Sequence, residues 1–317
     1  MIQFSPLFPL RSLLVLLLTV LLPAPQWVLA ATTAKPRPPY LDREQQCRPQ
    51  PLPALVLHLA GNAWKLDRQG NQMPLQEGMS IDVEEGVSTS PDAFVSLLLG
   101  DGSRIVLPSS SQVHLQIQEE LGIAQVVLDQ GQVESYVIKR TSEHDRFQIR
   151  TAVGVLGVRG THFRTRSEGD KALVEVLDGQ VAVDREQSTA SASTTASAAR
   201  VNGKQGMRIQ PQGELNTVEL LAAPQLAGQD GVRGDTPVWR LFVKPLAGAQ
   251  RYRAQVATDS EFLQIKQERF SNSPQFSFSG LQAAFYHVRL SAFDEQGLEG
   301  LAGVYDILYL PKTSHAP

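Results

Sequence analysis

The sequence predicts an all-β protein with two parts: a β-rich domain folded as a short solenoid or flattened barrel, and then a β-sandwich. Short apolar segments alternate with glycine-containing and aspartate-containing turns along most of the 317 residues. This is the pattern of strands joined by tight turns. In the clearest segment Val113, Leu115 and Ile117 alternate with polar residues. One face of that strand is therefore expected to be buried and the other to meet solvent.

A weak internal repeat indicates how the first domain is built. An apolar strand meets an aspartate and a glycine and then continues as a strand in residues 126–133 and again in residues 176–181, with a looser copy in residues 201–206. Repeated units of this kind predict a sheet that winds back on itself. Residues 94–99 and 104–107, separated by Gly-Asp-Gly-Ser, predict a hairpin.

The first 30 residues have the features of a secretory signal peptide. Arg11 supplies positive charge, Leu13 to Leu22 form an apolar run, and the small residue Ala30 ends the segment. We therefore expect cleavage after Ala30 and a location in the periplasm of a Gram-negative envelope, without a membrane span after cleavage. A retained anchor is the alternative, because the apolar stretch is nearly long enough to cross a bilayer.

Composition sets the boundaries of the remaining segments. Proline-rich runs predict an extended linker, and a Ser/Thr/Ala-rich stretch without apolar periodicity predicts a disordered loop. A short helix is expected over residues 215–223, inside the second linker. The predicted parts are the signal peptide (1–30), a Pro-rich linker (31–53), the first β domain (54–210) with its disordered loop (187–200), a second linker (211–235) and the sandwich (236–312).

Charge and cysteine content argue against nucleic-acid binding and against a fold held by disulfides. The net charge is −3 and the pI is about 6.1, so no basic surface for nucleic acid is expected. Cys47 is the only cysteine of the chain, which excludes an intrachain disulfide. The folded part must therefore be held together by apolar burial.

Three glycines recur at every third position in Phe147 to Thr165: Gly154, Gly157 and Gly160. Glycine suits positions with positive φ or close backbone approach, so the segment predicts a strand, a glycine-punctuated turn region and a second strand. If Gly157 has positive φ, an added Cβ would cost about 1–2 kcal/mol. A phosphate-binding loop is not expected, because the next residues alternate as a strand instead of opening a helix.

The order of features over residues 55–185 resembles a FecR domain. Asp101-Gly102-Ser103, Gly131-Gln132-Val133 and Asp178-Gly179-Gln180-Val181 carry part of the resemblance, and Val158-Arg159-Gly160-Thr161-x-Phe163 is its most distinctive motif. The resemblance implies a β-rich periplasmic module. Its motif residues, expected to be structural or partner-binding, are Gly154, Gly157, Val158, Arg159, Gly160, Thr161 and Phe163.

Arg159 has two possible roles within this motif. Its guanidinium could hydrogen-bond the carbonyl groups of a nearby turn, or it could be presented to a partner. We expect the structural role, because a close glycine turn places carbonyl groups within reach.

Residues 236–311 resemble a fibronectin type III-like sandwich. Trp239 is expected in the core of an early strand, residues 252–257 alternate as a strand, and residues 285–294 form another in which Tyr286, Val288, Leu290 and Ala292 share a face.

The sequence contains no recognisable catalytic constellation. His144 lies between Glu143 and Asp145, but adjacent residues cannot converge on one ion by themselves. No serine lies in a Gly-x-Ser-x-Gly elbow. We therefore expect no enzyme activity, no cofactor and no metal.

Two functions follow from these expectations. The first is a non-enzymatic envelope module that binds another envelope protein or a receptor, or acts as a scaffold, with signalling as one possible role. The FecR resemblance implies regulators with a cytoplasmic segment that contacts a sigma factor, but ten residues before Arg11 are too few for one. The alternative is a peptidoglycan-binding or glycan-binding protein, for which Trp64, Tyr136 and Phe270 are the candidate stacking residues.

Overall fold

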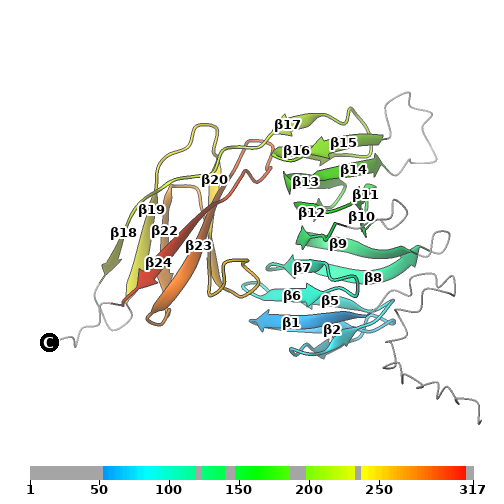
Figure 1. The fold of residues 1–317 in the computed structure, drawn as a ribbon, viewed down its shortest axis with the longest axis horizontal. Coiled ribbons are helices and arrows are strands. Elements are labelled where there is room, and N and C mark those ends of the chain that lie inside the picture. Colours follow the sequence, from blue (N-terminus) through cyan, green and yellow to red (C-terminus); the bar gives the residue numbers. More distant parts are fainter. Residues whose placement is uncertain (1–52, 119–122, 140–146, 186–197, 233–236, 312–317) are drawn as a thin grey trace, which may run out of the picture. The chain divides into compact units, whose positions relative to one another are not determined.

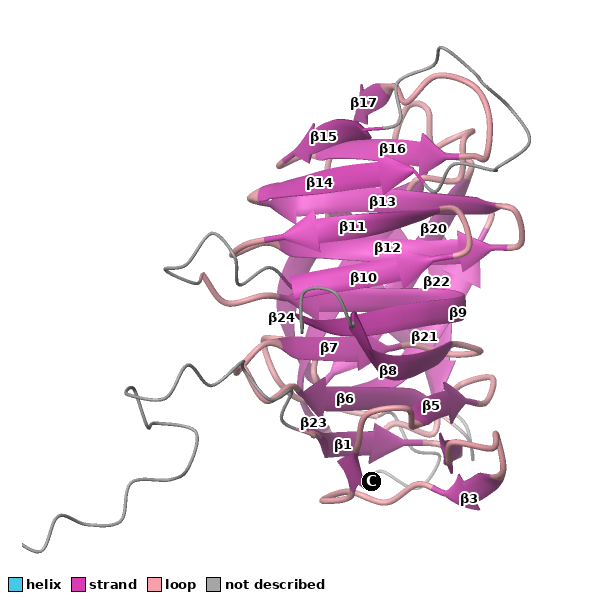
Figure 2. Cartoon of the chain, turned by 90° about the vertical axis from the view of Figure 1, so that its right-hand side faces the viewer, coloured by secondary structure: helices cyan, strands magenta, loops and turns pink. Residues whose placement is uncertain are grey.

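The computed structural model describes residues 53–118, 123–139, 147–185, 198–232 and 237–311. All of these residues belong to the compact unit that spans residues 46–317. The predicted signal peptide, nearly all of the first linker, and His144 with its acidic neighbours lie outside the described residues. The described chain consists of strands and loops (Figure 2), which confirms the all-β class. Within it, no helix has the length and apolarity to cross a membrane.

Among the described residues of the first domain, seventeen strands form one connected sheet (Figure 1). Their bounds are β1 (Ala54–Ala60), β2 (Ala63–Leu66), β3 (Gln72–Pro74), β4 (Ser80–Ile81), β5 (Gly86–Thr89), β6 (Phe94–Leu98), β7 (Arg104–Leu107), β8 (Gln112–Gln118), β9 (Ile123–Tyr136), β10 (Phe147–Thr151), β11 (Gly154–Val158), β12 (His162–Glu168), β13 (Lys171–Asp178), β14 (Gln180–Arg185), β15 (Ala198–Asn202), β16 (Gln205–Ile209) and β17 (Thr217–Glu219).

The connected sheet is folded into two layers. Layer A contains β1, β4, β6, β7, β12, β13, β16 and β17. Layer B contains β2, β3, β5, β8, β10, β11, β14 and β15. From β10 onward the chain places pairs of strands alternately in B and A. The first domain is therefore a flattened stack with open edges, as expected for a sheet that winds back on itself.

Strand β9 belongs to both layers. Its first half pairs with β8 and, in parallel, with β10 in layer B, and its second half pairs antiparallel with β7 and β12 in layer A. Gly131 marks the transition, with φ of +80°. There the N–H of Gln132 donates a 3.0 Å hydrogen bond to Ser111 Oγ, a buried side chain. The crossing thus depends on a residue that tolerates positive φ and on a buried hydroxyl.

The core of the first domain lies between the two layers. Val95 and Phe163 of layer A share one apolar cluster with Val113 and Ile149 of layer B. Each such side chain contributes about 1.5–3 kcal/mol on full burial. Residues 94–98 and 104–107 form the predicted hairpin. On the face predicted for 113–117, Val113 is buried and Leu115 is partly buried against the core cluster, whereas Ile117 is 36% exposed.

Three local predictions were wrong. Gly154 to Val158 is not a turn but strand β11, held between β10 and β14, and Gly157 is an extended residue within it. The segment predicted as a helix contains β17 instead, which pairs with β16. The end of the predicted disordered loop is strand β15, which pairs with β14, while residues 186–197 lie outside the described residues. In each case pairing with a neighbouring strand outweighs local propensity.

Seven further strands form two sheets. They are β18 (Leu226–Val232), β19 (Val238–Val243), β20 (Arg251–Ala257), β21 (Ile265–Ser271), β22 (Gln275–Ser279), β23 (Ala284–Phe293) and β24 (Gly303–Tyr309). One sheet has the order β18-β19-β22 and the other β21-β20-β23-β24. Strand β18 lies in the segment predicted as a linker, so the sandwich begins earlier than expected.

The sandwich has its own apolar core. Trp239 is almost fully buried and stacks on Tyr309, with the ring centroids 4.9 Å apart. Tyr286, Val288, Leu290 and Ala292 are buried in the same cluster, which confirms the face predicted for them.

Gly131→Ala tests the crossing of β9. A Cβ at Gly131 would lie 2.5 Å from the Ser110 carbonyl oxygen, whereas Gly70 has a similar φ of +82° but no atom within 4 Å of its added Cβ. We expect Gly70→Ala to lower the free energy of unfolding by about 1–2 kcal/mol, the cost of the left-handed conformation alone. Gly131→Ala should cost clearly more in urea denaturation. Equal losses in the two variants would contradict the role given to Gly131.

Candidate functional site

The structure distributes the FecR-like motif residues over a strand, a turn and a second strand. Gly154, Gly157 and Val158 lie in β11. Phe163 in β12 is fully buried in the core, and Val158 is almost so. Val158 and Phe163 therefore belong to the core, Gly154 is buried in its strand, and Gly157 is half-buried. Arg159, Gly160 and Thr161 connect β11 to β12.

Gly160 is the motif glycine that takes a positive φ, +63°. A Cβ there would lie 2.9 Å from the Cβ of Lys139, so the backbone after β9 passes directly over this turn. Thr161 fixes the same turn: its hydroxyl donates a 3.0 Å hydrogen bond to the Gln180 carbonyl oxygen, and its own carbonyl accepts one from Val137 N–H. Arg159 is exposed, and its structural role stays a prediction.

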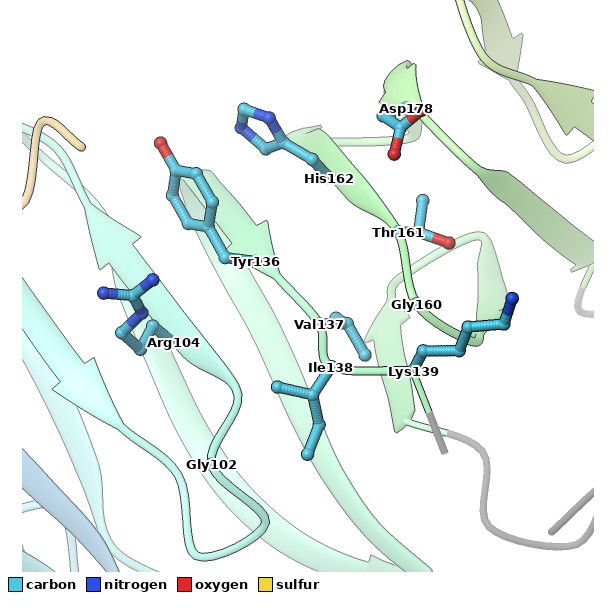
Figure 3. A pocket seen from close by; sticks show the side chains of 10 residues that line it. All are labelled: Gly102, Arg104, Tyr136, Val137, Ile138, Lys139, Gly160, Thr161, His162 and Asp178. Atoms are coloured by element: carbon cyan, nitrogen blue, oxygen red, sulfur yellow. The ribbon is translucent and has the colours of Figure 1, made fainter. Parts of the chain in front are cut away.

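The turn forms one wall of a surface recess of about 350 Å³ (Figure 3). Tyr136 at the end of β9 and His162 at the start of β12 lie on one side of it. Arg104 from β7, Lys139, Gly160 and Asp178 complete the rim. Lys139 and Asp178 are exposed, so the recess offers charges of both signs next to two aromatic rings. We define these six residues as the recess.

The aromatic pair in the recess is held by a buried carboxylate. The rings of Tyr136 and His162 stack with centroids 4.2 Å apart. His162 Nε2 lies 2.8 Å from Glu134 Oε1, and the Tyr136 hydroxyl lies 3.0 Å from the same oxygen. Burial, and then the charge of Glu134, raise the pKa of Tyr136 above its ordinary value, so the phenol stays protonated. Tyr136 therefore presents a neutral ring beside His162.

Glu134 links layer A to the sandwich. Both of its carboxylate oxygens accept hydrogen bonds from Arg289 of β23, each 2.7 Å long, and both residues are buried. Burial by itself would raise the pKa of Glu134, but Arg289 and then His162 hold it well below its ordinary value. A carboxylate in this setting acts as a fixed anion and not as a proton acceptor. The arrangement therefore positions groups and does not provide a general base.

A second buried cluster lies farther along the same contact. Arg164 of β12 contacts Glu299 at 2.6 Å, and Arg253 of β20 contacts Glu299 at 2.9 Å and Glu268 at 2.5 Å. Arg164 also donates to the backbone carbonyl groups of Glu299 and Gly300. Burial would raise the pKa of Glu299, but Arg164 and Arg253 lower it from 4.5 to about 2.

Removing one partner from such a cluster leaves an unpaired buried charge, at a cost of about 3–5 kcal/mol. The two domains therefore share a specific polar contact, and neither presents this face to solvent.

These clusters leave little signal in the sequence. Glu134, Arg164 and Arg253 lie in strands at alternate positions whose side chains point away from the core of their own domain, as solvent-facing residues do. Among the described residues no group of His, Cys, Asp and Glu side chains could hold a metal ion. The three aromatic residues proposed for glycan stacking lie apart: Trp64 in layer B, Tyr136 in layer A and Phe270 in the sandwich.

Comparison with known proteins identifies one part of the chain. Residues 85–182 match the FecR protein family. This FecR segment covers less than one third of the chain but runs from β5 into β14. It therefore includes β9, β12 and all six recess residues. No curated protein matches the sequence.

Solved structures resemble the chain only distantly. Two structures of a proposed anti-sigma factor from Parabacteroides distasonis are 20% and 19% identical, each with a TM-score of 0.35. Each match covers 42% of this chain and 59% of the other, so this chain spans little more than half the length of those proteins. The glycoside hydrolase domain of Endo-D from Streptococcus pneumoniae is 8% identical with a TM-score of 0.24, over 80% of this chain and 37% of that one.

The depressed pKa of Glu299 predicts acid sensitivity. Glu299 stabilises the fold above its unfolded pKa, near 4.5, and this contribution is lost as the pH falls toward 2. We expect it to be on the order of 3 kcal/mol. Glu299→Gln should lower stability at neutral pH, because it leaves Arg164 and Arg253 undercompensated, and should flatten the loss below about pH 5.

Denaturant unfolding at a series of pH values measures both effects. Glu295→Gln is the control, because Glu295 is an exposed residue in the turn between β23 and β24, and it should keep the wild-type pH slope. A wild-type slope in Glu299→Gln would show that Glu299 is not the group responsible.

Proposed function

We propose that this protein is an exported, non-enzymatic module of the cell envelope that binds another envelope protein and acts in signalling. The observation that carries the proposal is the FecR match, because it covers the residues that form the recess. FecR-type proteins are regulatory, which favours a protein partner over a substrate. The location in the periplasm rests on the signal-like sequence of residues 1–30.

The recess suits a protein partner. Its rim carries the exposed side chains of Lys139 and Asp178 beside the aromatic pair, and aromatic groups combined with a polar rim are typical of protein interfaces. The shape of the recess is fixed before binding, because Glu134 and Arg289 hold Tyr136 and His162 from below. A preorganised surface of this kind loses less conformational entropy when a partner binds.

We further propose that the second domain is a fibronectin type III-like spacer. A three-stranded and a four-stranded sheet in the orders β18-β19-β22 and β21-β20-β23-β24 support this assignment, as does the buried Trp239. Through the buried ion pairs the spacer would hold the FecR segment in one orientation. This would let the protein act as a rigid scaffold.

Cross-linking in living cells tests the proposal. The tagged chain would be cross-linked in the envelope, purified under denaturing conditions and its covalent partners identified by mass spectrometry. We expect one envelope protein or receptor to be recovered reproducibly. Recovery of peptidoglycan fragments alone, together with co-sedimentation of the purified chain with peptidoglycan, would overturn the proposal in favour of glycan binding.

Reversing the charge of Lys139 tests whether the partner binds at the recess. Lys139→Glu should reduce the recovered partner by at least about tenfold, because a reversed charge at an interface repels the groups that the native charge attracted. Arg68→Glu makes the same charge change in an exposed turn between β2 and β3 and should leave recovery unchanged. Melting temperatures within about 2 °C of the wild type would exclude unfolding as the cause. Equal recovery with Lys139→Glu would remove the recess from the interface.

A further inference from the structure

One edge of the sandwich carries the most exposed large apolar side chains of the described residues. Leu310 is 65% exposed, Leu308 60%, Phe285 53% and Val304 51%. The next in the described part of the chain is Met73, in the other domain, at 49%. Single exposed apolar residues are common on protein surfaces, but a group of four such residues is not. We define these four residues as the apolar edge.

The apolar edge lies on one face and borders an open strand. Phe285 pairs with Leu308 and Arg289 with Val304 across β23 and β24, so alternate residues of β24 point to the same side. β24 is the last strand of its sheet. Its outer backbone N–H and C=O groups therefore have no neighbouring strand within that sheet.

Natural proteins usually protect such an edge with lysine, proline or a bulge. β24 contains one charged residue, Asp306, and its carboxylate lies 2.6 Å from Nδ1 of His287 on β23. The β23–β24 pairing continues without a register shift from Gly303 to Tyr309. Within Gly303 to Tyr309 the strand thus has no lysine, proline or bulge, and Asp306 is its one charged residue.

The contact between the domains does not cover the apolar edge. On β23 that contact uses Arg289, whose side chain bonds to Glu134. Val304 pairs opposite Arg289 and Phe285 lies near the start of the strand, yet both stay more than half exposed with the first domain in place. The apolar edge is therefore available to an occupant from outside the molecule.

We propose that the occupant is a second copy of this chain, paired antiparallel through β24 to form a two-fold symmetric dimer with a continuous sheet. A two-fold axis near Ile307 would place Val304 of one copy opposite Leu310 of the other, and Asp306 opposite Leu308. The same patch would then meet itself, as a two-fold interface requires. Asp306 contacts Nδ1 of His287 within its own copy and would lie opposite Leu308 of the other copy, so the two Asp306 carboxylates would not face each other directly.

The exposed area sets the expected strength of the dimer. Four large side chains that are each more than half exposed present roughly 400 Å² of apolar surface per copy. A stable protein–protein interface buries about 800 Å² per partner. Pairing at the edge covers only part of this surface, and backbone hydrogen bonds add to it without closing the gap, so the dimer is weak and depends on concentration. This inference does not rest on the proposed function, because it needs no envelope partner and its tested residue, Leu308, is not a recess residue.

Sedimentation velocity of the purified full chain over the micromolar range tests the dimer. We expect reversible monomer–dimer exchange, and Leu308→Lys should weaken it at least about tenfold by placing a charge in the paired strand. Met73→Lys is the matched control, because Met73 is a similarly exposed apolar residue on the edge strand β3. It should associate like the wild type. Leu310→Lys replaces Leu308→Lys if the latter does not fold.

Hydrogen exchange at low and high protein concentration identifies the paired strand. Amides of β24 should become more protected as the dimer forms, whereas those of β18, an edge strand of the other sheet, should not. A chain that stays monomeric at several hundred micromolar would overturn the proposal. So would a Met73→Lys variant that associates as weakly as Leu308→Lys, or protection that rises elsewhere and not in β24.

Discussion

Strand β9 pairs with strands of both layers, and much of the described structure follows from this constraint. Its first half completes layer B beside β8 and β10, and its second half completes layer A beside β7 and β12. Gly131 makes the transition possible, because a side chain there would collide with the backbone of Ser110 and Ser111. The second half then carries Glu134 and Tyr136 on the face that points away from the core of the first domain. The recess and the contact with the sandwich therefore both originate from one strand.

The two domains are joined by apolar clusters, in which Phe94 and Val106 pack with Phe262 and Leu173 packs with Leu298, and also by buried ion pairs. Desolvating Glu134, Arg289 and Glu299 is costly, and their mutual attraction roughly offsets that cost. What such pairs provide is a single allowed arrangement, because any shift leaves a buried charge without its partner. The same Glu134 carboxylate contacts His162 and Tyr136. The contact between the domains thus also sets the shape of the recess, and a partner bound there would meet a surface that depends on both domains.

The recess and the apolar edge are chemically different surfaces. The recess has exposed charges of both signs around two stacked rings, whereas the apolar edge is a row of aliphatic and aromatic side chains beside an unpaired strand. A rigid body with one polar and one apolar surface can engage two occupants at the same time. Self-association through β24 would double the number of recesses per particle and raise the apparent affinity for a clustered partner.

The sequence by itself determined the all-β class, the hairpin of β6 and β7, the buried face of β23 and the resemblance of the first domain to FecR. These features depend on residues close together in the chain, whose period and turn chemistry are visible in one dimension. The tertiary structure decided that Gly154 to Val158 is a strand, because β10 and β14 flank it from either side. It also decided that Glu134, Arg164 and Arg253 are buried in ion pairs. On a strand a charged residue in an outward position looks the same whether it meets water or another domain, and only the packing of two distant segments distinguishes these cases.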